Sequence, residues 1–150
     1  MKFKIKKKYT YIIAEIGNNH EGSFSNAKKL IYEASKTGVN AVKFQTFKTN
    51  EFVINKDKKK ILKKFEISYD DFEKLKNITH EKKLNFISTP LDIESAMFLG
   101  KISDAIKISS GDNNFFKLIE VCLRYNKDII ISLGLLDHIE TNKVIKNIMK

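Results

Sequence analysis

Two patterns of hydrophobic and polar residues alternate along the chain: a short apolar run, and a longer stretch with helical spacing. The short runs are rich in Ile, Val and Phe, as expected of parallel strands that are buried on both faces. Turn residues or polar residues close each run. The five predicted strands are Tyr11–Ile16, Ala41–Thr46, Asn85–Ser88, Ala105–Ile108 and Ile129–Ser132.

Amphipathic segments separate these runs. Within Ser25–Thr37, apolar residues such as Ala27, Leu30 and Ile31 recur three and four positions apart, and Gly38 follows as a stop signal. Ser68 is a cap residue for a helix that begins at Tyr69. The other predicted helices are Lys56–Phe65, Ile93–Leu99, Asn114–Tyr125 and a last one from the cap residue Asp137 to Lys150.

Five strand–helix units in a row predict a parallel sheet with right-handed crossovers in one domain, residues 1–150. Two architectures fit this order, an open doubly wound sheet and part of a (β/α)₈ barrel. No GxGxxG motif follows the first strand and the chain has no P-loop, which weakens the nucleotide-binding form of the open sheet. A closed barrel typically takes about 250 residues, so 150 residues predict only the first five units.

Polar residues at the strand ends favour the barrel. Because side chains alternate, Lys43 and Gln45 share one face of their strand, opposite Val42 and Phe44. We expect the apolar face to contact the helices and the lysines to point inward, at the C-terminal mouth where barrel active sites lie. The other polar residues expected at this mouth are Glu15, Thr89, Lys107, Ser109, Ser110 and Ser132.

Two inward lysines with several hydroxyls indicate an anionic ligand, a phosphate or a carboxylate, because a buried lysine is costly unless it is paired. The alternative for Lys43 is an internal ion pair with Glu15. Asp112 is either a turn residue or an acid/base group at the mouth. His20, in the loop after the first strand, is catalytic, donates to substrate or fixes the loop, and Asp92 is expected to cap a helix.

The composition narrows the function classes. The net charge is +10, but 27 of the 28 basic residues are Lys and aromatic residues do not interleave with them, so we expect a solvated surface and no nucleic-acid partner. No apolar run approaches the ~20 residues of a membrane helix. The single cysteine, Cys122, is expected to be buried in a helix, which fits a reducing cytoplasm. His80 and His138 are expected on the surface, and neither forms a metal-binding pair with His20.

The chain from Tyr11 to Lys150 resembles the sialic acid synthase family, which includes N-acetylneuraminate, legionaminate and pseudaminate synthases. Several segments match in order and spacing, which makes the resemblance specific. They are IIAEIGNNHEG, GVNAVKFQTF, FISTPLDIES, AIKISSGD and KDIIISLGL. Two positions depart from the family pattern: Ser132-Leu133-Gly134-Leu135 replaces STGM, and Asp112 stands where many members have Glu.

The resemblance implies a synthase that condenses phosphoenolpyruvate with an N-acylated amino sugar aldehyde and releases phosphate. It implies a role for each matching residue: Lys43 and Thr89 for the phosphoenolpyruvate carboxylate, Lys107, Ser110 and Ser132 for its phosphate, Glu15 near the sugar, Asp112 for the attacking water, and Asn19, His20 and Gln45 lining the substrate site.

The resemblance also implies what this chain lacks. The last three barrel units, the metal-binding histidines and a C-terminal sugar-binding, antifreeze-like domain are expected to lie outside it, so we expect no activity from the chain alone. The family implies a divalent metal, Mn or Mg, and a homodimer of the full-length chain. Two alternatives stay open: a non-catalytic anion-binding α/β module, and a Lys-rich nucleic-acid binder.

Overall fold

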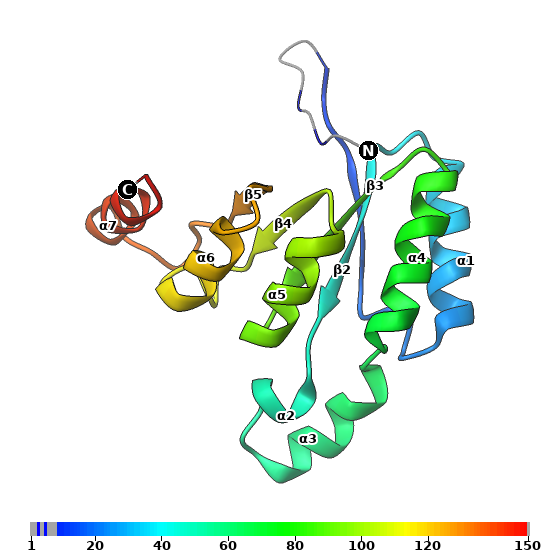
Figure 1. The fold of residues 1–150 in the computed structure, drawn as a ribbon, viewed down its shortest axis with the longest axis horizontal. Coiled ribbons are helices and arrows are strands. Elements are labelled where there is room, and N and C mark those ends of the chain that lie inside the picture. The colour runs from blue at the N-terminus through cyan, green and yellow to red at the C-terminus, as the bar shows by residue number, and fades with distance from the viewer. Residues whose placement is uncertain (1–2, 4, 6–8, 150) are drawn as a thin grey trace.

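The fold of the chain is a single parallel sheet with helices between its strands (Figure 1). A computed structural model describes residues 3, 5 and 9–149. All neighbouring strands are parallel, and their order in the sheet follows their order in the chain. The strands are β1 (Ile13–Gly17), β2 (Ala41–Thr46), β3 (Asn85–Pro90), β4 (Ala105–Ile108) and β5 (Asp128–Ile131).

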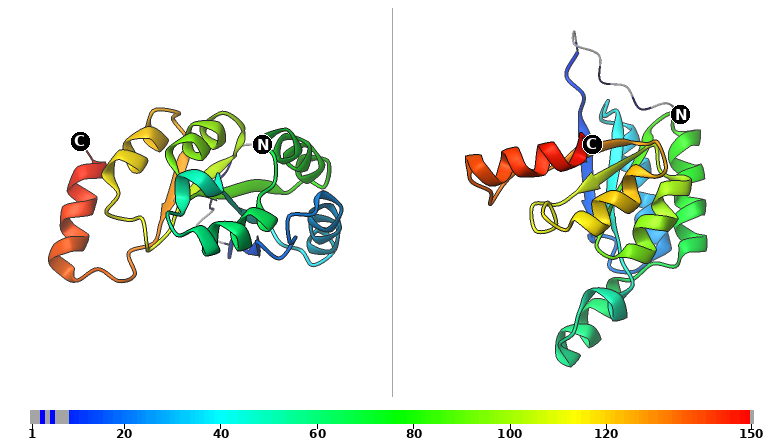
Figure 2. Two further views of the ribbon diagram at one scale, coloured as in Figure 1. Left: turned by 90° about the horizontal axis from the view of Figure 1, so that it is seen from below. Right: turned by 60° about the vertical axis from the view of Figure 1, so that its left-hand side comes forward.

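The sequential strand order confirms the barrel that the sequence favours over a doubly wound sheet. A doubly wound sheet reverses its strand order at a switch point and carries helices on both faces. Here the order does not reverse, and the helices run in an arc along one side of the sheet (Figure 2, left). The structure therefore confirms the wall of a (β/α) barrel. The helices are α1 (Phe24–Ser35), α2 (Thr49–Phe52), α3 (Lys56–Leu62), α4 (Tyr69–Glu81), α5 (Ile93–Ile102), α6 (Phe116–Leu123) and α7 (His138–Ile148), with a 3₁₀ turn, η1, at Lys63–Phe65.

Apolar packing joins the helices to the outer face of the sheet. Val42 and Phe44 of β2 are fully buried against Phe72 and Leu75 of α4. The Phe44 ring lies 5.5 Å from the Phe86 ring and 5.9 Å from the Phe72 ring, between ring centroids. Such aromatic contacts add to the free energy of burial. The alternation predicted for β2 is thus confirmed, because its apolar residues face the helices.

Side-chain caps begin most of the longer helices where the sequence predicts them. Ser68, Asp92 and Asp137 each accept a hydrogen bond from a backbone N–H in the first turn of the following helix. Most boundaries differ from prediction by one to three residues; β1 is Ile13–Gly17 rather than Tyr11–Ile16, and α5 extends to Ile102 rather than Leu99. β3 runs through Pro90, two residues further than expected, and α6 begins at Phe116 because the preceding residues form a turn closed by the Phe115 N–H and the Asp112 carbonyl.

The N-terminal end of the sheet is closed by aromatic and polar contacts. The Phe3 and Tyr11 rings pack edge-on at 5.1 Å, and the Tyr11 hydroxyl donates to Oδ1 of Asn85 at 2.7 Å. Burial raises the pKa of Tyr11 to about 12. His80, expected on the surface, is only 24% exposed and lies 2.8 Å from the Asp104 carboxylate, which also accepts the Phe86 N–H. That expectation is corrected, because the contact between Nε2 and the Asp104 carboxylate holds the ring in a partly buried position, whereas His138 is exposed as predicted.

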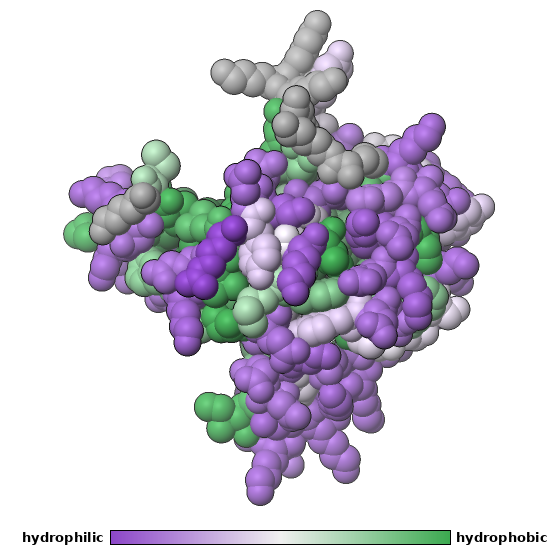
Figure 3. Space-filling model, viewed as in Figure 1, coloured by the Kyte–Doolittle hydropathy of each residue, from purple (hydrophilic) through white to green (hydrophobic). Residues whose placement is uncertain are grey.

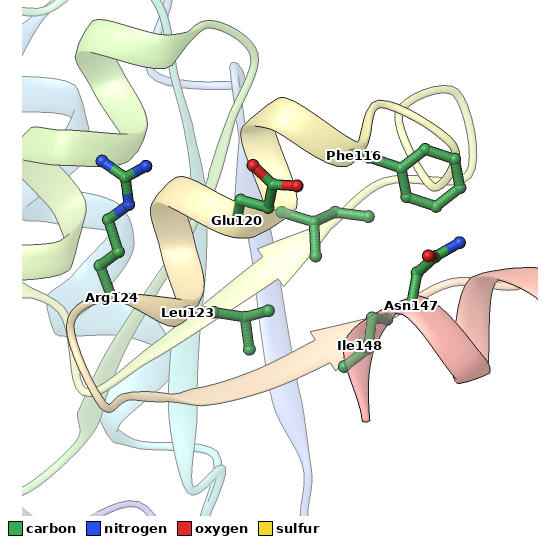
Figure 4. A pocket seen from close by; sticks show the side chains of 7 residues that line it. Phe116, Glu120, Leu123, Arg124, Asn147 and Ile148 are labelled. Carbon is green, nitrogen blue, oxygen red and sulfur yellow. The ribbon is translucent and has the colours of Figure 1, made fainter. Parts of the chain in front are cut away.

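The fifth strand and the last helix are less buried than the rest. β5 is an edge strand, and Val144 is the only buried residue of α7 within the described part of the chain. Hydrophobic surface gathers over α6 and α7, whereas hydrophilic surface covers much of the face in Figure 3. A groove of about 600 Å³ separates these two helices, and Phe116, Leu123 and Ile148 line it (Figure 4). In the described part of the chain, no helix is long and apolar enough to cross a membrane.

A substitution at Gly100 tests the packing of α5 against Tyr125, which lies just after α6. In an exposed helix, Gly→Ala stabilises by about 0.5–1 kcal/mol. At residue 100 a β-carbon would lie 2.2 Å from Cδ2 of Tyr125, so the ring must move. We expect Gly100→Ala to lower the free energy of unfolding by about 1–3 kcal/mol in urea denaturation. Lys101→Ala, at the exposed neighbouring position, is the control, and equal stability of the two variants would contradict the packing.

Candidate active site

The inner face of the sheet carries charged and hydroxyl side chains toward the C-terminal ends of the strands. Glu15 of β1 is the register partner of Lys43 of β2, and Gln45 is the partner of Thr89 of β3. Lys107 of β4 pairs with Ile130 of β5, on the same side of the sheet. Because alternate residues of each strand share a face, the sheet brings these side chains to one mouth. They come from four different strands, as in a barrel active site.

Lys43 and Glu15 form an ion pair across β1 and β2. The Lys43 side chain is 16% exposed, whereas that of Glu15 is 52% exposed. The internal pair that the sequence left as an alternative for Lys43 is therefore present. The carboxylate fixes the direction of the Lys43 side chain across the two strands.

Lys107 lies in a partly buried, cationic environment. Its ammonium donates to the backbone carbonyl of Ile108. Burial lowers the pKa of Lys107, the neighbouring Lys43 ammonium lowers it further, and the Glu15 carboxylate opposes both effects. Two ammonium groups that disfavour each other, partly shielded from water, form a site in which a multiply charged anion relieves the repulsion.

Residues of the loop after β1 lie on both faces of the sheet. Asn18 donates from Nδ2 to Oε1 of Gln45 at 2.8 Å, on the inner side, and Asn19 is exposed. His20 is fully buried, with its ring 6.0 Å from that of Phe44, which faces the helices. Its Nδ1 accepts the Gly22 N–H at 3.0 Å, and burial lowers its pKa. Of its three interpretations, the geometry corresponds to the residue that fixes the loop.

The end of β3 is buried and tightly bonded. Thr89 is 3% exposed. Asp92 caps α5 through the Ser95 N–H at 2.7 Å and accepts the Lys48 N–H at 2.8 Å. Asp92 therefore ties the segment after β2 to α5, and the preference for a helix cap at this position is confirmed.

Hydroxyl groups line the loops after β4 and β5. The Ser109 hydroxyl donates to the Asp112 carboxylate within a tight turn. Gly134 lies between two serines: a β-carbon at this position would be 3.6 Å from Cβ of Ser110 and 3.8 Å from Oγ of Ser132. Ser110 and Ser132 thus flank one small residue, although they belong to different loops.

Two asparagines in these loops were not among the predicted site residues. Asn18 orients Gln45, and Asn113, 1% exposed, donates from Nδ2 to the carbonyls of Ser132 and Gly134, both at 3.0 Å. The available signal was their position, because each follows a strand end and loop asparagines commonly bond to the backbone. An asparagine at such a position predicts a turn, but it does not identify the group to which its side chain donates.

The predicted site residues thus form three neighbouring groups. Glu15, Lys43 and Lys107 interact electrostatically, Gln45 and Thr89 are register partners, and Ser110 and Ser132 flank Gly134. Asp112 lies in the same loop as Ser110, whereas His20 lies on the helix side of β2. Among the described residues, no three His, Cys, Asp or Glu side chains converge as metal ligands would. The residues present therefore do not fit a divalent metal centre of their own.

Comparisons with known proteins find relatives of this chain. A profile described as the NeuB family matches residues 30–150. N,N'-diacetyllegionaminic acid synthase of Campylobacter jejuni is 36% identical over 146 residues, which cover 85% of this chain and 43% of that protein. An uncharacterised protein of Methanocaldococcus jannaschii is 38% identical over 144 residues, covering 91% of this chain and 43% of that protein.

Solved structures show the same fold. The N-acetylneuraminic acid synthetase of Leptospira borgpetersenii superposes with a TM-score of 0.87 at 30% identity, covering 93% of this chain and 50% of that one. A truncated 3-deoxy-D-arabino-heptulosonate 7-phosphate synthase of Thermotoga maritima, 15% identical with a TM-score of 0.69 over 93% of this chain and 46% of that one, shares the fold alone. The chain spans less than half the length of the curated relatives named above.

The electrostatics of the mouth predict how Lys107 titrates. Lys43→Met removes the neighbouring positive charge and raises the Lys107 pKa, whereas Glu15→Gln removes the opposing carboxylate and lowers it. Both shifts are measurable by NMR titration of the Lys107 side chain. Lys76→Met, on α4, is the control. Equal Lys107 pKa values in all three variants would show that the groups do not interact.

Proposed function

We propose, since this chain belongs to the NeuB family, that it is part of a synthase that condenses phosphoenolpyruvate with an N-acylated amino sugar aldehyde, similar to N-acetylmannosamine. The product is a sialic-acid-type nonulosonic acid, and phosphate is released. The observation that carries the proposal is the pair of inward lysines, Lys43 and Lys107, with Ser110 and Ser132 in the loops that follow β4 and β5. The names of the relatives support this reaction class.

Phosphoenolpyruvate carries a carboxylate and a phosphate, and the mouth offers a cationic group for each. We assign the carboxylate to Lys43 and Thr89, and the phosphate to Lys107 with Ser110 and Ser132. Lys43 then exchanges part of its ion pair with Glu15 for the ligand, and the anion relieves the repulsion between the lysines. Fixed ammonium and hydroxyl groups hold the trianion in a single orientation, which lowers the entropic part of the barrier.

The reaction makes a carbon–carbon bond and a carbon–oxygen bond to water, and it breaks the carbon–oxygen bond to phosphate. The enol carbon attacks the aldehyde carbon, the aldehyde oxygen takes up a proton, and positive charge develops on the carbon that bears the phosphate. Water adds to that carbon and loses one proton, which balances the proton taken up by the aldehyde oxygen. The tetrahedral intermediate then expels phosphate, and its hydroxyl proton passes to the departing phosphate as the ketone forms. The lysines and serines stabilise the negative charge of the departing phosphate.

Other residues of the mouth have proposed roles in this scheme. Asp112, next to the serines, takes the proton of the attacking water. Its turn partner Ser109 orients the carboxylate. Glu15, half-exposed at the edge of the sheet, lies toward the sugar. Gln45, oriented by Asn18, and exposed Asn19 line the substrate site, and His20 supports their loop.

The remainder of the site is proposed to come from beyond these residues. The matched relatives are more than twice as long as their match to this chain, and we propose that further barrel units complete the mouth. We assign any Mn or Mg ligands to those units as well, together with the sugar-binding domain and homodimer contacts. No step above depends on a metal. A cytoplasmic location is proposed because Cys122 is buried and unpaired.

Calorimetry with phosphoenolpyruvate tests the assignment of Lys107. We expect Lys107→Met to weaken binding roughly 10–100-fold, because a hydrogen bond to a charged group is lost. Lys101→Met, an exposed lysine of α5, is the matched control. Binding to the wild-type chain without condensation of N-acetylmannosamine indicates that further units are needed, and equal affinities of the two variants would contradict the assignment.

Gly134 provides a steric test of the phosphate position. A methyl group there makes ordinary contacts with Ser110 and Ser132, so Gly134→Ala should leave the unfolding midpoint within about 2 °C. The same methyl occupies the space between the two serines, so phosphoenolpyruvate affinity should fall about tenfold. Unchanged affinity for phosphoenolpyruvate would place its phosphate elsewhere.

A further inference from the structure

Hydrogen bonds from the Asn113 side chain join the loop after β4 to the loop after β5. Its side chain is 1% exposed, and Nδ2 donates to the carbonyls of Ser132 and Gly134, at 3.0 Å each. An amide nitrogen has two N–H groups, so both are used by these two acceptors. The two carbonyls belong to the segment that carries one of the serines assigned to phosphate.

The backbone of Ser132 is consequently held from two sides. Its N–H donates to the Ile108 carbonyl at 3.1 Å, which extends the β4–β5 pairing, and its carbonyl accepts from Asn113. Gly134 is held by the same side chain and lies against Ser110. The distance between Ser110 and Ser132 therefore depends on Asn113, which is three residues from the first serine and bonded to the second.

Little else restrains this segment. Among the described residues, no other side-chain hydrogen bond reaches the backbone of residues 132–134. Leu133 is half-buried, Gly134 is exposed, and Leu135 is 86% exposed with a positive φ of 69°. Removing the amide would leave two carbonyls without their donor and free the segment to move away from Ser110.

We propose that Asn113 is a positioning residue that sets the spacing of Ser110 and Ser132 and thereby the affinity of the mouth for the phosphate of phosphoenolpyruvate. This inference rests on the proposed function. Asn113 contacts no substrate in this scheme and acts through Ser132. Side chains that hold ligand-binding residues in place commonly control affinity as strongly as the ligands themselves.

A double-mutant cycle in phosphoenolpyruvate affinity tests the proposal by calorimetry. We expect Asn113→Ala to weaken binding about tenfold, and Asn113→Asp to weaken it further, because a carboxylate then faces two carbonyl oxygens. Asn114→Ala, the exposed neighbouring asparagine, is the matched control and should bind as the wild type does. In a Ser132→Ala background, Asn113→Ala should cause less than a twofold further loss, because its partner in binding is already absent.

The cycle separates positioning from a general structural role. A loss of stability alone lowers the unfolding midpoint but leaves the affinity of the folded fraction unchanged, and full additivity with Ser132→Ala would likewise overturn the proposal. If Asn113→Ala does not fold, Asn113→Asp and Asn113→Ser take its place in the cycle. No binding by the wild-type chain contradicts the assignment of the phosphate to Lys107, Ser110 and Ser132, and the contact between Asn113 and Ser132 is then judged by Ser132 amide hydrogen exchange. Faster exchange of the Ser132 amide in Asn113→Ala than in Asn114→Ala supports the positioning role of Asn113, and equal exchange rates overturn it.

Discussion

The alternation of side chains along β2 is the constraint on which the rest of the structure depends. Val42 and Phe44 are buried beneath the helices, so Lys43 and Gln45 must occupy the opposite face. A one-residue shift in register would bury two polar side chains and expose two apolar ones. Packing on the outer face therefore holds the charged groups of the inner face in place.

The separate roles of the two faces explain how the mouth can hold two lysines that repel each other. Lys43 and Lys107 lie close enough to lower the pKa of Lys107, and Glu15 compensates only in part. The apolar contacts of Phe44 with Phe72 and Phe86 stabilise the sheet independently of these charges. The chain can consequently keep two repelling lysines on its inner face, because their free-energy cost is offset on the other side of the strands.

Loops, by contrast, are held by single polar side chains. Asp92 joins the segment after β2 to α5, His20 closes the turn after β1, and Asn113 joins the loops after β4 and β5. The hydrogen bonds of Asp92 and Asn113 join residues that are far apart in the sequence. The arrangement of the mouth is therefore more sensitive to these residues than to the exposed lysines that dominate the net charge.

The sequence by itself determined the strands, the caps at Ser68, Asp92 and Asp137, and the inward face that carries Lys43, because alternation and capping are local properties of the chain. Only the tertiary structure decided that His20 turns toward Phe44, that His80 contacts Asp104, and that Asn113 reaches Ser132. These outcomes depend on which distant groups meet. A short polar side chain in a loop has many possible partners, and packing of the sheet and helices selects one of them.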